Sequence, residues 1–378
     1  MLFRSKLGAV VQRHSDMNDP IAIYVHIPFC SKRCGYCDFN TYTFKELAGG
    51  EDVVHGYLQA VDTEISLAKN VLGGREVDTI FFGGGTPTML PARSLVSIIE
   101  RIRDNFNLAK DAEITTEANP DTVNEEYFEN LLQGGFNRIS FGVQSVVPRI
   151  LKLLDRTHRS EDVAGTITAA HRSGFTHINA DLIYGTPGES IDDWKNSLES
   201  VLALPIDHVS AYSLIVENGT KFAAQVKRGE VQMPDEDLNA DKYVLTDQML
   251  EQRGMQWYEV SNWSLPGGEC RHNLHYWRSD DWWGIGAGAH SHVNGVRWSN
   301  QKLPASYIAQ SEVVGKEVLT IEDLALERIM LRLRMREGIE LSLLPETRVK
   351  AALNDGLVQV ENNVVTLTRQ GKIGRAHV

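Results

Sequence analysis

Three of the chain's four cysteines lie close together near the N-terminus, while the fourth, Cys270, stands alone. Cys30, Cys34 and Cys37 follow the spacing C-x₃-C-x₂-C. Thiolates bind soft metals and iron–sulfur clusters, whereas zinc ribbons usually offer two separated cysteine pairs. A four-iron cluster held by three cysteines keeps one iron open for a small molecule. The spacing therefore predicts a cluster, and the scarcity of cysteine elsewhere disfavours the alternative of three unconnected thiols.

A glycine run and several polar residues follow the predicted strands. Residues 83–87 read Gly-Gly-Gly-Thr-Pro, and bare Cα atoms let a backbone approach a ligand closely. No Gly-Lys-Ser/Thr follows, so the run is not a P-loop, and a tight turn is the alternative interpretation. Polar residues near other strand ends offer hydrogen bonds to a ribose or an ammonium group, although each alone is typical of a strand cap or a surface charge. These residues are Glu117, Gln144, Arg156 and Asp181.

An aromatic segment with several histidines lies in the second half of the chain. Six of the seven tryptophans fall between Trp257 and Trp298, and residues 271–277 read Arg-His-Asn-Leu-His-Tyr-Trp. Imidazole is a common axial ligand of haem iron, and aromatic rings supply flat apolar surface for a macrocycle. His272 could be such a ligand, with Cys270 and His275 as adjacent alternatives. From the residues alone, the favoured interpretation is a buried aromatic cluster whose histidine only donates a hydrogen bond. His290 and His292 are also expected to be structural.

The elements that position these residues alternate between strands and helices. Alternation with short turns favours a parallel sheet with right-handed crossovers, with ligands at the carboxyl ends of the strands. After the sixth strand the regular alternation of strands and helices ends, and a helix is expected over 237–253. A helix at 321–333 and a hairpin of 358–360 with 364–367 resemble a small winged-helix unit. The predicted strands are 21–25, 77–82, 113–118, 138–143, 178–183 and 208–216.

Composition limits the classes of function. The chain has 378 residues, 42% of them hydrophobic, which predicts two domains or one large domain with an appendage. A net charge of −12 argues against nucleic-acid binding. No apolar run in the sequence approaches membrane-spanning length, and no secretory signal is recognisable. Four cysteines without a paired framework fit a reducing compartment, so a cytoplasmic location is expected.

Residues 24–29, Tyr-Val-His-Ile-Pro-Phe, followed by C-x₃-C-x₂-C, resemble the radical S-adenosylmethionine (SAM) superfamily. The resemblance runs from about residue 21 to about residue 367 and implies an α/β fold with a partial (β/α)₆ barrel. It implies a [4Fe-4S] cluster on Cys30, Cys34 and Cys37, whose open iron binds SAM and whose electron cleaves SAM to a 5′-deoxyadenosyl radical. The SAM-binding residues that the resemblance implies are Tyr24, Tyr36, Gly84, Gly85, Thr86, Glu117, Gln144, Arg156, Asp181 and Ile215.

Within that superfamily the chain is most similar to the branch of oxygen-independent coproporphyrinogen III oxidases and the related HemW haem chaperones. The oxidases carry a further cysteine where this chain has Phe39, and they have a long N-terminal arm that is missing here. The HemW family carries an H-N-x-x-Y-W motif linked to haem binding, which His272, Asn273, Tyr276 and Trp277 match. The resemblance therefore implies a haem carrier, with no catalytic residue assigned and enzymatic activity left undecided. The alternatives are the oxidase, which decarboxylates two propionates, and a radical SAM enzyme for another substrate.

The implied partners are haem, a haem-acceptor protein that is respiratory or membrane-associated, and an electron donor for the cluster. The expected divisions are an N-terminal extension at 1–20, a radical SAM core at 21–235, a haem-binding segment at 236–303 and a C-terminal module at 304–378. Met17 is a candidate start of the chain, because it directly precedes the first strand. The tail from residue 373 to 378 is expected to be foreign or truncated sequence.

Overall fold

The computed structural model describes residues 19–233, 235–309 and 313–376. The expectations about Met17 and about nearly all of the N-terminal extension lie outside these residues, as does the very end of the tail.

Six parallel strands form the centre of the molecule, as the sequence predicts. Each strand pairs with the next along the chain, and the strands begin and end within a few residues of the predicted bounds. The largest difference is in the third strand, which starts six residues earlier than expected, at Asn107 instead of Glu113. The strands are β1 (Ile21–Ile27), β4 (Glu76–Gly84), β5 (Asn107–Ala118), β6 (Arg138–Gln144), β7 (His177–Tyr184) and β8 (His208–Ser213).

The aromatic segment extends this sheet at both edges, which the sequence analysis did not predict. Strand β11 pairs in parallel with β1, and β12, β13 and β14 follow it antiparallel, while β10 and β9 continue the sheet beyond β8. The added strands have three to five residues, too few for an alternating pattern to be recognised. They are β9 (Gln256–Glu259), β10 (Asn262–Ser264), β11 (Trp282–Ile285), β12 (His290–Val293), β13 (Val296–Ser299) and β14 (Val314–Val318).

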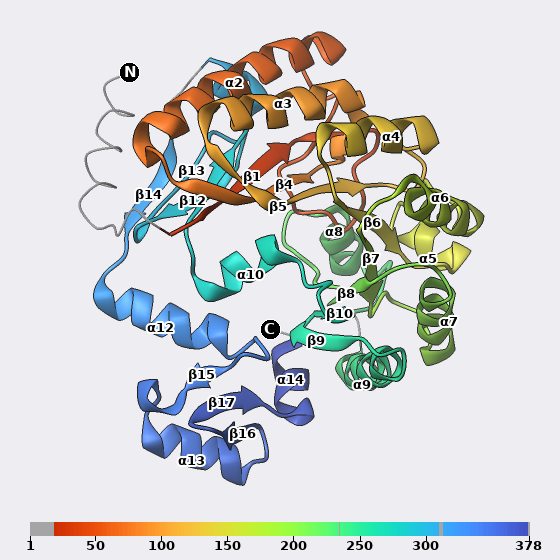
Figure 1. Cartoon of the computed structure of the whole chain (residues 1–378). Coiled ribbons are helices and arrows are strands. Elements are labelled where there is room, and N and C mark those ends of the chain that lie inside the picture. Colours follow the sequence, from red (N-terminus) through yellow and green to blue (C-terminus); the bar gives the residue numbers. More distant parts are fainter. Residues whose placement is uncertain (1–18, 234, 310–312, 377–378) are drawn as a thin grey trace.

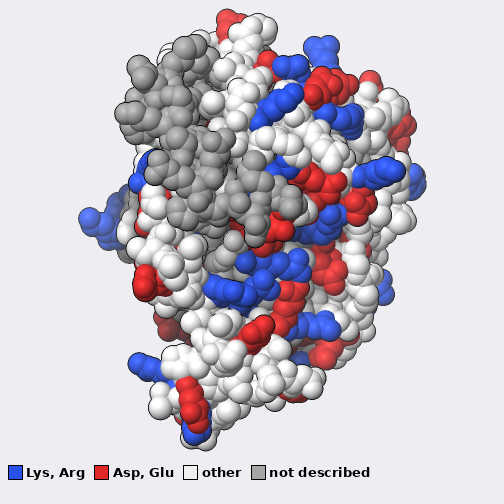
Figure 2. Space-filling model, turned by 60° about the vertical axis from the view of Figure 1, so that its left-hand side comes forward, with Lys and Arg blue, Asp and Glu red and all other residues white. Residues whose placement is uncertain are grey.

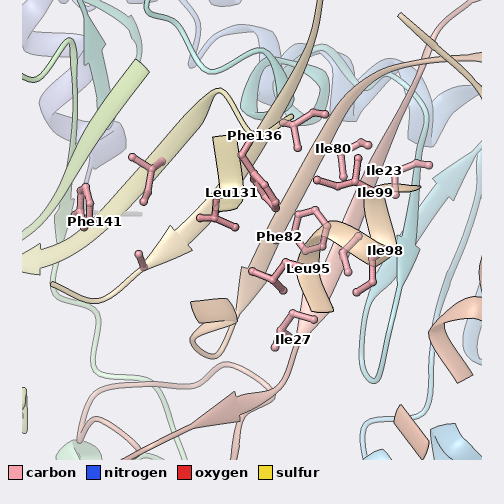
Figure 3. Packing of buried hydrophobic residues seen from close by; sticks show 14 of the residues in the cluster. Ile23, Ile27, Ile80, Phe82, Leu95, Ile98, Ile99, Leu131, Phe136 and Phe141 are labelled. Carbon is pink, nitrogen blue, oxygen red and sulfur yellow. The ribbon is translucent and has the colours of Figure 1, made fainter. Parts of the chain in front are cut away.

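Helices cover the outside of the curved sheet (Figure 1). Figure 3 shows apolar side chains of the strands, such as Ile80 and Phe82, pointing toward side chains of the helices, such as Leu95 and Ile99. Each of these residues is fully buried, which stabilises the fold by about 1.5–3 kcal/mol per side chain. The helices are α2 (Val53–Leu72), α3 (Ala92–Asn105), α4 (Glu125–Gly134), α5 (Pro148–Leu153), α6 (Ser160–Ser173), α7 (Ile191–Leu202), α8 (Lys221–Lys227) and α9 (Glu236–Gln252).

The inner face of the six strands is largely polar. In β6, Ile139 and Phe141 pack outward in the core, and the alternate residues Arg138 and Ser140 line the interior cavity. Successive side chains of a strand point to opposite faces, so the apolar residues hold the helices and their neighbours surround an internal space. Parallel strands buried on both faces usually read as continuous apolar runs. The alternation here therefore points to a barrel interior that receives a polar ligand.

The C-terminal module contains a helix and a hairpin as predicted. Its hairpin turns at Asn362 and Asn363, which both have positive φ and fit a two-residue turn. The apolar residues of the predicted helix at 321–333 suggest one buried face, but none of the residues of α12 is fully buried and Ile321 is 83% exposed. The remaining elements are β2 (Phe29–Cys30), β3 (Tyr42–Thr43), α10 (Arg271–Arg278), α11 (Pro304–Ile308), α12 (Ile321–Arg332), β15 (Ile339–Glu340), α13 (Glu346–Asn354), β16 (Val358–Glu361), β17 (Val364–Leu367) and α14 (Arg369–Ala376).

Charges of both signs are interspersed on the face shown in Figure 2, with basic side chains next to acidic ones rather than gathered in a stripe. Ion pairs also join charges elsewhere on the chain's surface, as those of Arg278 and Arg332 with Glu337 do. This face therefore lacks the single-sign field by which proteins attract the nucleic-acid backbone.

Candidate functional site

A cavity of about 600 Å³ occupies the barrel interior and opens beside the cysteine loop. All three clustered cysteines line it, together with all ten residues expected to bind SAM. Of the four residues expected to bind haem, His272, Asn273 and Tyr276 also line it, whereas Trp277 does not. The indole of Trp277 instead lies beneath the guanidinium of Arg334, 4.6 Å from it. The structure thus brings two sites that the sequence separates by more than 200 residues into one cavity.

The cysteine loop is tied to the glycine run by backbone hydrogen bonds. The amide of Gly85 donates to the Ile27 carbonyl at 2.8 Å, and the amide of Thr86 donates to the Phe29 carbonyl at 2.8 Å. A Cβ atom on Gly85 would stand 2.6 Å from the Phe29 oxygen, so only glycine fits there. Close packing therefore explains why Gly85 is a glycine. The same hydrogen bonds hold the loop of Cys30 against the cavity wall.

Two of the three clustered thiols have a hydrogen-bond donor nearby. The Thr86 hydroxyl lies 3.9 Å from Cys30 Sγ, and Arg156 Nη1 lies 3.6 Å from Cys34 Sγ, so each can donate to a cluster-bound sulfur. Burial raises the pKa of Cys30 to about 11, so iron must displace a proton to bind. No three His, Cys, Asp or Glu side chains in the described residues converge as ligands of one ion. A polynuclear cluster takes one thiolate per iron and does not require such convergence.

Arg156 and Gln144 meet where β6 ends. Arg156 Nη2 donates to Asn119 Oδ1 and to the Gly142 carbonyl, both at 2.6 Å, which fixes its guanidinium beside the cysteine loop. Gln144 has φ of 63°, an uncommon conformation for a residue other than glycine. Strained backbone of this kind costs about 1–3 kcal/mol and clusters at ligand-binding sites. The end of β6 is therefore shaped to present these two side chains to the cavity.

Two buried carboxyl groups, from strands on either side of β6, line the cavity. Glu117 accepts a hydrogen bond from the Gly84 amide at 3.1 Å, and Asp181 accepts one from the Ser140 hydroxyl at 2.7 Å. Burial, with a smaller contribution from the charge of Asp181, raises the pKa of Glu117 to about 8. Burial also raises the pKa of Asp181. Both groups therefore favour a ligand that brings positive charge or hydroxyl donors, which are features of SAM.

Helix α10 brings the histidine motif to the opposite end of the cavity. The Glu113 carboxylate accepts hydrogen bonds from the amides of Arg271 and His272, at 3.1 and 3.0 Å, and so holds the first turn of this helix. His272 is 1% exposed, and its ring stacks on Phe81 at 5.2 Å. Thr79 Oγ1 lies 2.9 Å from His272 Nδ1, and Tyr276 Oη lies 2.9 Å from Nε2.

Burial lowers the pKa of His272 well below its usual value, so the ring is neutral and one nitrogen carries a lone pair. His275, an alternative iron ligand, differs. Burial lowers its pKa, but hydrogen bonds to Asp280 and Asp78 outweigh that effect and raise it to about 9. A protonated imidazole has no lone pair for iron, so the geometry favours His272 over its neighbour.

A chain of hydrogen bonds joins the two ends of the cavity. Asn179 Nδ2 donates to Asp181 Oδ1 at 2.7 Å, and Asn179 Oδ1 accepts from His208 Nδ1 at 2.6 Å. The other nitrogen of His208 must then accept, and it does so from the Tyr258 hydroxyl at 2.9 Å. Asn273 Nδ2 in turn donates to that hydroxyl at 3.1 Å. These hydrogen bonds link Asp181, which is expected to bind SAM, with Asn273 of the histidine motif.

Several cavity residues were missed by sequence reasoning, which looked for polar residues only where strands end. Thr115, Arg138, Asn179 and His208 lie within or at the start of strands, and Tyr258 comes from the edge strand β9. The sequence does hold a signal for the first four, because they occupy alternate positions to buried apolar residues of the same strands. Tyr258 carries no comparable signal.

Comparison with known proteins agrees with this geometry. Residues 24–201 match the family model of the radical SAM superfamily. The chain is 45% identical to the haem chaperone HemW of Mycobacterium tuberculosis, over 94% of this chain and 92% of that protein. It is 33% identical to HemW of Bacillus subtilis, over 93% of this chain and 96% of that one, and 36% identical to HemW of Escherichia coli, over 84% of each.

Among solved structures, coproporphyrinogen III oxidase (HemN) from Escherichia coli, described as a radical SAM enzyme, has a similar fold. The TM-score is 0.83 and the identity 26%, covering 98% of this chain and 92% of the oxidase. The identities to the chaperones extend over nearly the whole chain, well beyond the barrel. The chain therefore belongs to the radical SAM superfamily and, within it, to the HemW family of haem chaperones.

Proposed function

We propose that this protein binds haem and passes it to an acceptor protein, and that it carries a [4Fe-4S] cluster and SAM in the same cavity. The family supports this proposal, because relatives named haem chaperones match almost the whole chain. The observation that carries it is the shared cavity, in which the three clustered cysteines and the His272 motif line one space.

The cysteines would hold the cluster, and the residues around them would bind and orient SAM. Arg156 donates toward Cys34, and Glu117 and Asp181 accept hydrogen bonds from ribose hydroxyls or from the ammonium group. Tyr24 and Tyr36 flank the adenine, and the lining residues Gly84, Gly85, Thr86, Gln144 and Ile215 complete this site. When bound by these cysteines and reduced, the cluster would supply an electron for the cleavage of SAM.

His272 is the proposed axial ligand of haem iron. Its Nε2 lies 2.9 Å from the Tyr276 hydroxyl, so ligation through Nε2 requires that hydroxyl to turn away. Tyr276 and Phe81 offer aromatic surface next to the imidazole, and Asn273 holds the start of α10 to Tyr258. Trp277 would act indirectly, because it packs behind α10 rather than in the cavity.

The alternative function is that of the oxidase, which the similar fold of HemN favours. Phe39 argues against it. This side chain is 64% exposed at the rim of the cavity, at the position where the oxidase branch carries an additional cysteine. A phenyl ring cannot replace a thiol as a ligand or as a hydrogen donor.

The implied partners are an electron donor for the cluster and a haem acceptor, which we propose to be a respiratory or membrane-associated protein that meets this chaperone in the cytoplasm. In the described residues, no helix is long and apolar enough to cross a membrane. We retain the division into a core at 21–235, a haem-binding segment at 236–303 and a C-terminal module at 304–378, with the segment's strands built into the core's sheet.

Anaerobic titration with haemin tests the proposal. We expect wild-type protein to develop a Soret band, and we expect His272→Ala to bind haemin at least tenfold more weakly. His290→Ala is the matched control, because that imidazole is exposed at the start of β12. A wild-type titration that equals a protein blank would rule out the carrier. Formation of protoporphyrinogen from coproporphyrinogen III and SAM would instead establish the oxidase.

A further inference from the structure

The floor of the cavity contains two polar side chains with unused hydrogen-bonding atoms. Thr115 of β5 and Arg138 of β6 stand directly opposite each other in the sheet, so their side chains share the inner face at one level. Both residues are 1% exposed and both line the cavity. Thr115 Oγ1 and Arg138 Nη1 have no hydrogen-bond partner among the described residues. An unpaired buried donor costs about 1–3 kcal/mol, so two at one place point to a missing partner.

The floor holds one buried cation, Arg138, beside one buried carboxylate, Glu113. Arg138 Nη2 donates to the Gly268 carbonyl at 2.7 Å, and Nη1 lies 3.5 Å from Glu113 Oε2, beyond a good hydrogen bond. Glu113 already accepts hydrogen bonds from two amides of α10. The neighbouring His208 is neutral, because burial, followed by the charge of Arg138, lowers its pKa. Nη1 of Arg138, which makes this long ion pair but no hydrogen bond, can still donate one to an anion in the cavity.

We propose that Thr115 and Arg138 form a subsite for one carboxylate of the ligand held in the barrel. This inference rests on the proposed function, in which that carboxylate is a propionate of haem. The Arg138 Nη1 and the Thr115 hydroxyl supply two donors, which match the two oxygens of a carboxylate. A cation would be repelled by Arg138. A phosphate, with three or more oxygens and a larger charge, needs more donors than these two, and Glu113 beside them disfavours the larger charge.

SAM also carries a carboxylate, which must be distinguished from that of haem. With the cluster on the cysteine loop, the SAM carboxylate would bind its open iron near Cys34 and Arg156. Thr115 and Arg138 instead lie within or at the start of their strands and line the cavity together with Tyr258 and His272. The floor also borders the His272 motif through Glu113, which contacts both Arg138 and α10. A propionate on Arg138 would therefore orient the macrocycle whose iron His272 binds.

Haemin and its dimethyl ester test the subsite, because esterification removes both propionate charges and leaves the macrocycle intact. We titrate the anaerobic, cluster-bearing protein with each and follow the Soret band. Wild-type protein is expected to bind haemin at least tenfold more tightly than the ester, and Thr115→Val to reduce that preference about three- to tenfold. Thr115→Val should leave the melting temperature unchanged or higher, because the hydroxyl has no partner to lose.

Thr186→Val is the matched control, since Thr186 is also buried with an unpartnered hydroxyl but does not line the cavity. It should keep the full preference. The double variant Arg138→Met with Glu113→Gln removes the charged pair together, and it should bind haemin and ester equally.

The outcomes distinguish failure of the proposed haem binding from failure of the proposed carboxylate subsite. If wild-type protein binds neither compound, the proposed function fails. If it binds both equally, or if Thr115→Val keeps the full preference, haem binding stands and the subsite is wrong. If Thr115→Val weakens SAM binding in calorimetry and leaves the haemin preference intact, the carboxylate is that of SAM and the assignment to haem is overturned.

Discussion

The two ends of the barrel cavity differ in how their residues reach it. At the mouth, Cys30, Cys34 and Cys37 come from one loop, and the residues expected to bind SAM come from consecutive strands and from the segments that follow them. At the floor, Thr115, Arg138 and His208 lie within or at the start of strands, and His272 arrives on a helix from the second half of the chain. The cysteine loop of the mouth is thus a local sequence pattern, whereas the floor exists only after long-range packing.

The hydrogen bonds of the two ends differ in the same way. The mouth is held largely by the backbone, as where Gly85 and Thr86 donate to carbonyls beside the cysteine loop. The floor is held by side chains, with Glu113 at the start of α10 and Tyr258 between His208 and Asn273. Substitutions at the mouth should therefore remove a cofactor and leave the fold, whereas substitutions at the floor should affect stability and ligand binding together.

The largest effect is expected at the mouth. Cys34→Ala should abolish the cluster's visible absorbance after anaerobic reconstitution, because two thiolates do not replace three. Cys270→Ala is the control from the floor and should keep that absorbance. If Cys34→Ala keeps the absorbance and Cys270→Ala loses it, the cluster has been placed at the wrong end of the cavity.

At the floor, Glu113→Ala should destabilise the fold by about 3 kcal/mol, because it leaves Arg138 buried without its ion pair and removes the acceptor for two amides of α10. Urea unfolding measures this change. Glu125→Ala at the exposed start of α4 should cost less than about 1 kcal/mol. Equal effects of the two variants would show that α10 is not anchored as described.

The raised pKa of Glu117 predicts a pH dependence of stability. Its value of about 8 against 4.5 means that the folded protein keeps a proton that the unfolded chain has released between these pH values. The free energy of unfolding should therefore fall as pH rises through this window, by about 1 kcal/mol per pH unit from this group.

Glu117→Gln should remove that contribution, so its unfolding free energy should vary less between pH 5.5 and 7.5 than that of wild-type protein without SAM. Glu129→Gln, on the exposed face of α4, should behave like wild type. Identical slopes for wild type and Glu117→Gln would contradict the buried, protonated carboxyl group.

The smallest effect concerns the link between the two ends. Tyr258→Phe removes the hydroxyl that joins His208 to Asn273. We expect SAM to change the affinity for haemin severalfold in wild-type protein, and the variant to reduce this change to less than twofold. Asn262→Ala provides a control near the cavity but outside the chain of hydrogen bonds. An undiminished effect of SAM in Tyr258→Phe would show that the chain does not couple the sites.

The sequence predicted the mouth well and the floor poorly, for a physical reason. The cysteine spacing and the glycine run are local patterns, and all the residues expected to bind SAM line one cavity. His272 was found through its motif, but its position in the same cavity depends on α10 packing against β4 and β5. The strands β9 to β14 escaped prediction because they are short, and Arg138 escaped because a charged residue at the start of a strand looks like a surface group.

Electron paramagnetic resonance tests most directly whether cluster and haem share one cavity. We load the protein with haem under an excess of reductant, so that cluster and haem both stay reduced, and measure the relaxation of the cluster's signal with and without haem. The account predicts faster relaxation or a broadened signal, because a paramagnetic haem iron on His272 lies within the same cavity as the cluster, and His272→Ala should restore the original signal. Haem that binds fully, as its Soret band shows, yet leaves the relaxation of the cluster unchanged would contradict the account.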